Sequence, residues 1–189
     1  MSAMKEITWI GRGGQGAFTA SRVLGAAAMF AGYQSLAFPS FGPERRGAPI
    51  RAFTRISDST ITDRSIPQKS DYIIVLDDSL YDISLAKGLK EGGCIFVNTA
   101  KDIPRPDGIR IISGDISKYA SEILGKPIVN IGIIGLLLKE FSGIDIKNVY
   151  SSVEEYMPAK TVEKNKILLE QVYWKESVFD NETEKESDK

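Results

Sequence analysis

The feature that most constrains this chain is a glycine-rich run at residues 11–16, Gly-Arg-Gly-Gly-Gln-Gly, here called the glycine loop. Residues 7–10 before it are apolar or strand-forming, and residues 16–31 after it are apolar on nearly every face. This order predicts a strand, a tight turn and a buried helix. Glycine lets a ligand approach bare backbone, and a helix start offers unpaired N–H groups. The loop therefore predicts a site for a phosphate-bearing ligand.

Apolar runs and helix-like segments alternate along the rest of the chain. Predicted strands cover residues 5–10, 34–38, 50–56, 71–76, 94–97 and 109–112. Predicted helices cover residues 16–31, 79–90, 115–124, 131–138, 146–156 and 159–173. After the alternating strand at 50–56, a turn is expected to return the chain as a hairpin over 60–65. We therefore predict an α/β fold with a mostly parallel, Rossmann-like open sheet, helices on both faces and a β-hairpin excursion near residues 48–66.

The length of 189 residues suits one domain with one sizeable core. We assign residues 1–175 to this α/β domain. Residues 176–189 form an acidic, polar tail that we expect to be disordered.

Composition excludes several classes of chemistry. The formal net charge is -1, so no nucleic-acid partner is expected, but residues 1–70 hold nine Lys/Arg against four Asp/Glu, which fits an anion-binding half. The chain has no histidine, which removes histidine-dependent nucleophiles. Its one cysteine, Cys94, cannot form an internal disulfide, a cysteine-rich zinc site or an iron–sulfur cluster, and its apolar surroundings predict a buried small hydrophobe.

No membrane span is expected. The longest apolar stretch, residues 131–138, is far shorter than the ~20 residues that a spanning helix needs. The N-terminal residues contain polar breaks and do not resemble a signal peptide. We therefore expect a cytoplasmic protein.

The candidate site is assembled from loops that follow predicted strands. In parallel sheets, ligands bind at the carboxyl ends of the strands. Those ends are the glycine loop, residues 38–47, Asp77-Asp78 and Asn98-Thr99. We expect these four segments to meet at one edge of the sheet.

A nicotinamide cofactor is one alternative for the glycine loop, and a tight turn without a ligand is another. A nicotinamide site needs a carboxylate at the end of the second strand to hold the ribose. That strand ends at Phe38-Pro39, and Glu44, beyond a proline-containing loop, is a poor substitute. A Walker A phosphate loop is excluded, because no Gly-Lys-Ser/Thr follows the glycines.

A second candidate segment is Glu44-Arg45-Arg46, here called the basic loop, which lies in a stretch stiffened by Pro39, Pro43 and Pro49. Two guanidinium groups on a rigid loop suit bidentate recognition of phosphate, although a solvated charged loop is the alternative. A helix N-terminus contributes at most about 2 kcal/mol, whereas micromolar affinity needs about 8 kcal/mol. Arginine contacts or a second subunit must therefore supply the difference.

The remaining polar candidates have simpler explanations. Asp77 and Asp78 could act as an acid/base pair, but capping of the next helix explains them more simply. Asn130 precedes a buried helix, where it could be an N-cap or a ligand contact.

The glycine loop and the segment Phe38–Pro49, about 25 residues apart, resemble the gamma subunit of the 2-oxoacid:ferredoxin oxidoreductases, the pyruvate:ferredoxin oxidoreductase family. The likeness covers most of residues 5–175. The resemblance implies an enzyme that decarboxylates a 2-oxoacid on thiamine diphosphate, passes electrons singly to 4Fe-4S clusters and transfers the acyl group to coenzyme A. It also implies that thiamine diphosphate, Mg and the clusters lie on alpha, beta and ferredoxin-like partner subunits, with ferredoxin or another acceptor reached through them.

The resemblance further implies that this chain contributes to a coenzyme A site and contains neither a catalytic residue nor a metal site. Carried over to this sequence, the coenzyme A residues are Arg12, Gly13, Gly14, Gln15, Gly16, Glu44, Arg45, Arg46 and Asn130. The expected function is a gamma subunit that helps to position coenzyme A and is not active alone. The alternatives are a free-standing NAD(P) dehydrogenase and a non-catalytic anion-binding assembly module. The 2-oxoacid substrate is not predicted by this sequence.

Overall fold

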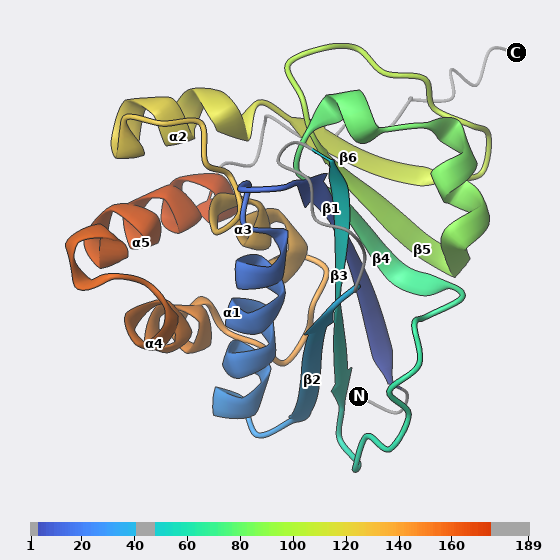
Figure 1. Ribbon diagram of the computed structural model, residues 1–189, viewed down its shortest axis with the longest axis horizontal. Helices are drawn as coiled ribbons and strands as arrows, with labels where there is room; N and C mark the ends of the chain where they lie inside the picture. The colour runs from blue at the N-terminus through green and yellow to red at the C-terminus, as the bar shows by residue number, and fades with distance from the viewer. Residues whose placement is uncertain (1–3, 41–47, 175–189) are drawn as a thin grey trace, which may run out of the picture.

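The structure is a computed structural model that describes residues 4–40 and 48–174 (Figure 1). The basic loop and the expected disordered tail lie outside these ranges. The strands are β1 (Lys5–Arg12), β2 (Gln34–Pro39), β3 (Pro49–Ser57), β4 (Ser70–Val75), β5 (Leu89–Asn98) and β6 (Arg110–Gly114). The α-helices are α1 (Ala17–Phe30), α2 (Ile116–Leu124), α3 (Gly132–Leu138), α4 (Ile146–Tyr156) and α5 (Ala159–Trp174). None of the helices in these ranges is long and apolar enough to cross a membrane.

The strands form one open sheet in the order β2-β3-β1-β4-β5-β6. Strands β1, β4, β5 and β6 pair in parallel, whereas β3 is antiparallel to both of its neighbours, β1 and β2. The predicted α/β open sheet is therefore confirmed, with one antiparallel strand inserted beside its central strand.

The expected hairpin return over residues 60–65 is wrong, because the structure contains no strand there. Both edges of β3 are already paired, by β1 and by β2, so a returning strand has no edge to join. Instead, this segment supplies polar partners for the Arg55 side chain. The Arg55 guanidinium donates to the Asp63 carbonyl and forms an ion pair of 3.1 Å with the Asp63 carboxylate.

The two faces of the sheet are covered differently (Figure 1). The α-helices α1 to α5 lie on one face. The other is covered by two short 3₁₀ helices, η1 (Asp78–Leu80) and η2 (Ile83–Gly88), and by the connection from β5 to β6. The predicted helix over 79–90 is therefore two 3₁₀ turns. Asp77 and Asp82 each cap a new turn, which restarts the backbone instead of letting an α-helix propagate.

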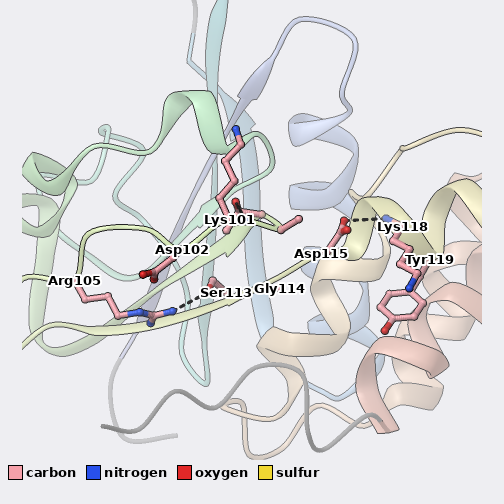
Figure 2. A pocket seen from close by; sticks show the side chains of 10 residues that line it. Lys101, Asp102, Arg105, Ser113, Gly114, Asp115, Lys118 and Tyr119 are labelled. Atoms are coloured by element: carbon pink, nitrogen blue, oxygen red, sulfur yellow. Dashed lines mark hydrogen bonds between the residues drawn. The ribbon is translucent and has the colours of Figure 1, made fainter.

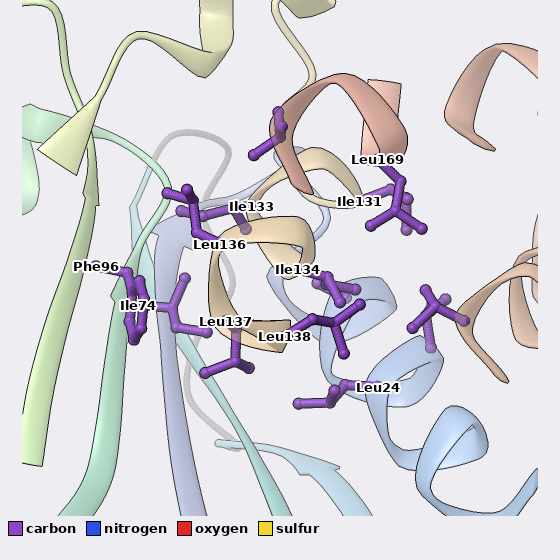
Figure 3. Packing of buried hydrophobic residues seen from close by; sticks show 14 of the residues in the cluster. Leu24, Ile74, Phe96, Ile131, Ile133, Ile134, Leu136, Leu137, Leu138 and Leu169 are labelled. Atoms are coloured by element: carbon purple, nitrogen blue, oxygen red, sulfur yellow. The ribbon is translucent and has the colours of Figure 1, made fainter. Parts of the chain in front are cut away.

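The helix α3 lies at the centre of the helical layer, between the sheet, α1 and α5 (Figure 3). All seven of its residues are buried, which explains why its sequence is apolar on every face. Glycines let α5 approach closely. A Cβ on Gly135 would lie 2.8 Å from the Leu169 carbonyl oxygen, and one on Gly132 would lie 2.9 Å from Leu168.

A buried hydrogen-bond chain joins β1, β3 and α1. The Trp9 indole Nε1–H donates to the Thr54 hydroxyl at 3.0 Å, and that hydroxyl donates to the Ser21 carbonyl at 2.9 Å. All three residues are fully buried. Without this chain the indole N–H would be unpaired in an apolar core, which costs free energy.

A cluster of charged side chains lies where the parallel strands begin, at their amino ends. Asp71 accepts hydrogen bonds from Lys90 at 2.8 Å, from the Glu6 backbone N–H at 2.8 Å and from Lys5 at 3.1 Å. Glu6 in turn pairs with Arg55 at 2.8 Å and Lys90 at 3.1 Å. Burial acts to raise the pKa of Asp71, but the hydrogen bonds from Lys90, Glu6 and Lys5 outweigh it and lower that pKa overall.

We predict that Thr54→Val lowers the free energy of unfolding by about 1–3 kcal/mol, because it leaves the Trp9 N–H without an acceptor. Thr54→Ser is the matched control, since it keeps the hydroxyl and removes only a methyl group. Urea unfolding of the purified chain measures both. Equal destabilisation by the two variants would show that the hydroxyl contributes nothing.

We predict that Asp71→Asn destabilises the chain by about 1–3 kcal/mol at neutral pH. Because the folded-state pKa of Asp71 is lowered, its contribution is present above the unfolded value of 3.8 and is lost as the pH falls through the folded value. The stability gap between wild type and variant should therefore narrow below about pH 4. A gap that stays constant or widens in acid contradicts this assignment.

Candidate functional site

The glycine loop joins the end of β1 to the start of α1 at the carboxyl edge of the sheet (Figure 1). Gly14 and Gly16 have φ values of 95° and 80°, in the left-handed region that favours glycine. Gly16 is the N-cap of α1, and no side chain of the described residues caps this helix, whereas Asp115 and Asp145 cap α2 and α4. The first-turn N–H groups of α1 have no intrahelical acceptor. They therefore suit an anion that approaches over the glycines.

The loop is held by its own backbone and by the start of β3. The Gln15 N–H donates to the Arg12 carbonyl at 3.0 Å, and the Gly13 N–H donates to the Ala48 carbonyl at 3.1 Å. Ala48 directly follows the basic loop and Gly47 in the sequence. The described chain therefore resumes after the basic loop right beside the glycine loop.

Two side chains of the loop reach a carboxylate at the end of the neighbouring strand. The Gln15 Nε2 donates to Asp77 Oδ2 at 2.8 Å, and Arg12 Nε pairs with the same oxygen at 3.3 Å. Arg12 Nη2 also donates to the Ser79 hydroxyl at 2.7 Å. The contacts of Ser79 were not foreseen from the sequence, because nothing in the local pattern reveals that β1 and β4 are adjacent.

The expected capping role of Asp77 is confirmed, because its Oδ1 accepts the Ser79 N–H at 3.0 Å. Burial acts to raise its pKa, but hydrogen bonds from Ser79 and Gln15 and the Arg12 charge lower that pKa overall. Asp78 is bound to Lys101 at 2.9 Å and to the Thr99 hydroxyl at 2.9 Å, and the Lys101 contact lowers its pKa. Both carboxyls are therefore ionised near neutral pH, which does not suit a proton donor.

Asn130 lies against the glycine loop and is 3% exposed. Its Nδ2 donates to the Gly16 carbonyl at 3.3 Å, whereas its Oδ1 is buried without a hydrogen-bond partner in the part of the chain that is described. The N-cap of α3 is Ile131, so the capping alternative for Asn130 is wrong. The structure thus brings residues 12–16 and Asn130 together, while Glu44, Arg45 and Arg46 lie outside the described residues.

An open pocket of about 590 Å³ lies at the carboxyl ends of β5 and β6 (Figure 2). It is lined by Thr99, Ala100, Lys101, Asp102, Arg105, Ser113, Gly114, Asp115, Lys118 and Tyr119. Arg105 is anchored there by the Ile111 carbonyl at 2.6 Å and the Ser113 hydroxyl at 2.8 Å. The Asp78–Thr99 hydrogen bond joins the wall of this pocket to the turn that follows β4. The cations of this pocket were not foreseen, because they come from segments without a recognisable motif.

Asn98, at the end of β5, is a structural residue. Its Oδ1 accepts the N–H groups of Ile116 at 3.0 Å and Ser117 at 3.1 Å, and its Nδ2 donates to the Leu76 carbonyl at 3.1 Å. The side chain therefore fixes the start of α2 to the ends of β4 and β5 and has no spare polar atom for a ligand.

Neither a cluster of metal-binding side chains nor an exposed thiol lies among the described residues. They contain no group of three or more His, Cys, Asp or Glu side chains that could hold a metal ion. Cys94 is buried, and burial raises the pKa of its thiol to about 12. It is therefore the small core hydrophobe that the sequence predicts.

Comparisons with known proteins identify the family of this chain. The sequence model of the family described as pyruvate ferredoxin/flavodoxin oxidoreductase matches residues 6–174. The common subunit gamma of the pyruvate/ketoisovalerate oxidoreductases of Thermococcus kodakarensis is 38% identical over 186 residues, which cover 94% of this chain and 100% of that relative.

Two solved structures share the fold. Pyruvate oxidoreductase subunit PORC of Thermotoga maritima is 32% identical with a TM-score of 0.78, over 90% of this chain and 95% of that one. The 2-oxoglutarate:ferredoxin oxidoreductase of Magnetococcus marinus, solved with 2-oxoglutarate, coenzyme A and succinyl-CoA bound, is 18% identical with a TM-score of 0.76, over 91% of this chain and 31% of that one. The second likeness is one of fold alone. The chain belongs to the pyruvate ferredoxin/flavodoxin oxidoreductase family, as a gamma-type subunit of a 2-oxoacid oxidoreductase.

Proposed function

We propose that this chain binds and positions coenzyme A in a multisubunit enzyme that oxidatively decarboxylates a 2-oxoacid to an acyl-CoA and CO2. The observation that carries the proposal is the N-terminus of α1. Glycines leave its backbone accessible, and no side chain of the described residues caps it. It follows β1, from which the chain continues towards β3 and β2, whereas the chain leaving the neighbouring strand β4 continues the other way, to β5. Ligands of open α/β sheets bind at such switch points.

Coenzyme A matches the chemistry at this edge. Its pyrophosphate suits the first-turn N–H groups of α1, and its 3′-phosphate suits a guanidinium of Arg45 or Arg46. Asn130 supports the loop through the Gly16 carbonyl. The structure of the Magnetococcus marinus enzyme, which shares this fold, was solved with coenzyme A and succinyl-CoA bound.

In this proposal the chain binds and orients coenzyme A and performs no proton chemistry. The sequence has no histidine, the nearby Asp77 and Asp78 have lowered pKa values, and the Cys94 thiol is buried. A single cysteine does not fit a four-cysteine cluster. As the family resemblance implies, we propose that the 4Fe-4S clusters, thiamine diphosphate and Mg lie on alpha, beta and ferredoxin-like partners in a cytoplasmic complex, with ferredoxin or another acceptor reached through them. Thiamine diphosphate, when bound, supplies the carbanion stabilisation that decarboxylation requires.

The nicotinamide alternative fits the sheet poorly. In the dinucleotide-binding fold the second strand lies directly beside the first and its terminal carboxylate holds the ribose. Here β3 separates β2 from β1, which places the end of β2 two strand spacings, about 10 Å, from β1. That end is Phe38-Pro39 and carries no carboxylate. The alternative of a non-catalytic assembly module is tested by the experiments below.

We predict that replacing both Arg45 and Arg46 with alanine raises the KM for coenzyme A about 10–100-fold, because a charge-assisted hydrogen bond contributes about 1.5–3 kcal/mol. Thiamine-dependent decarboxylation of the 2-oxoacid without coenzyme A should be largely spared. The control is Arg64→Ala, an exposed arginine in the segment between β3 and β4. An unchanged coenzyme A KM in the assembled complex contradicts the proposed role.

We predict that Gly16→Ala raises the KM for coenzyme A and lowers the Tm of the complex. A Cβ at Gly16 would lie 2.5 Å from Asn130 Nδ2, in addition to a left-handed backbone cost of about 1–2 kcal/mol. Gly125→Ala is the matched control, because Gly125 has a φ of 72° and a Cβ added there would have no described atom within 4 Å. If both variants leave the coenzyme A KM unchanged, the glycine loop is not the phosphate site.

A further inference from the structure

Asp77 lies where the two central parallel strands end side by side. Ile10 of β1 pairs with Val75 of β4, and the Leu76 N–H donates to the Ile10 carbonyl at 2.8 Å. The next residue along the chain, Asp77, therefore stands directly beside the glycine loop. It is far from that loop in sequence, so only the sheet topology brings the two together.

The two oxygens of this carboxylate have separate partners. Oδ1 caps η1 through the Ser79 N–H at 3.0 Å. Oδ2 accepts from Gln15 Nε2 at 2.8 Å and pairs with Arg12 Nε at 3.3 Å. The capping function uses one oxygen only, and the other holds both long side chains of the glycine loop.

The contact with Gln15 is relayed into the loop backbone. While Gln15 Nε2 donates to Asp77, the Oε1 atom of the same amide accepts a hydrogen bond from the Arg12 backbone N–H at 2.7 Å. One carboxylate therefore fixes the rotamer of Gln15 and, through it, the peptide at the start of the loop. Glycine-rich backbone has a large conformational entropy, and fixing it in advance lowers the cost of binding a ligand.

A carboxylate beside an anion site carries an electrostatic cost, because like charges repel. Here the Arg12 guanidinium compensates the charge of Asp77 at 3.3 Å. An ionised aspartate at this place is therefore suited to holding the loop from behind and unsuited to contacting a phosphate.

We propose that Asp77 is a positioning residue of the coenzyme A site, which holds Gln15 and Arg12 so that the glycine loop keeps its ligand-binding shape. This inference rests on the proposed function of the loop. It assigns to Asp77 a role beyond the capping of η1.

The test is Asp77→Asn in the assembled complex. Asparagine is also a good cap, so its Oδ1 still accepts the Ser79 N–H, but its Nδ2 cannot accept from Gln15 or Arg12. Asp82→Asn is the matched control, because Asp82 caps η2 through the Ser84 N–H at 2.8 Å in the same manner. Gln15→Met is a second variant, which breaks the relay and leaves the cap of η1 unchanged.

The expected result is a rise of about tenfold in the coenzyme A KM for Asp77→Asn and for Gln15→Met. The kcat and the KM for the 2-oxoacid should stay within about twofold. Hydrogen exchange of the Arg12 amide should accelerate in both variants, because its acceptor is no longer held. Asp82→Asn should change neither the KM nor this exchange rate.

Two outcomes overturn the inference. If Asp77→Asn and Asp82→Asn change the coenzyme A KM equally, Asp77 acts only as the N-cap of η1. An unchanged coenzyme A KM in Asp77→Asn, while Gly16→Ala raises it, would also reject the positioning role but leave the proposed function standing. If Gly16→Ala and the Arg45/Arg46 double variant also leave that KM unchanged, the proposed function itself has failed.

Discussion

The fold depends on the burial of β1 between two differently oriented neighbours with α1 packed across it. β1 pairs with β3 on one side and with β4 on the other, and the layers on the two faces of the sheet bury its side chains along nearly the whole strand. The chain must then reverse within a few residues to lay α1 on the sheet. Glycines at 14 and 16 with positive φ make that turn possible, and the alanine-rich sequence of α1 lets the helix approach β2 and β3 closely. The open geometry of the loop, on which the proposed binding of an anion depends, is thus a consequence of how α1 packs on the sheet.

Charges are arranged differently at the two edges of the sheet. At the amino edge, Glu6, Arg55, Asp71 and Lys90 satisfy one another in a cluster that stabilises the strands. At the carboxyl edge, Asp77 and Asp78 are each paired with a basic side chain, but the N–H groups at the start of α1 have no side-chain cap among the described residues. The charges at the amino edge therefore stabilise the strands, whereas the carboxyl edge leaves backbone N–H groups accessible to the ligand that we propose.

Most of the fold could be predicted from the sequence, because the spacing of apolar residues indicates helices and strands, and glycine or aspartate residues mark where they begin and end. The helices α1 to α5 and the strands β1 to β4 and β6 lie close to their predicted ranges, whereas β5 begins at Leu89, five residues before the predicted start at residue 94. The insertion of β3 between β2 and β1 could not be predicted, because strand order depends on which faces and edges remain free after packing. For the same reason, the contacts of Ser79 and of the second carboxylate oxygen of Asp77 could not be predicted, because the sequence around each residue does not show which strands are neighbours in the sheet. Asn130 was foreseen as a site residue and lies against Gly16, but its role towards a ligand stays a prediction.

We propose that coenzyme A binds over the glycine loop of this chain. The most direct test is the structure of the assembled complex with coenzyme A bound. We expect the pyrophosphate oxygens to lie within hydrogen-bond distance, about 3 Å, of the backbone N–H groups at the start of α1. A nucleotide bound entirely on partner subunits, with no phosphate oxygen near residues 12–19, would contradict it.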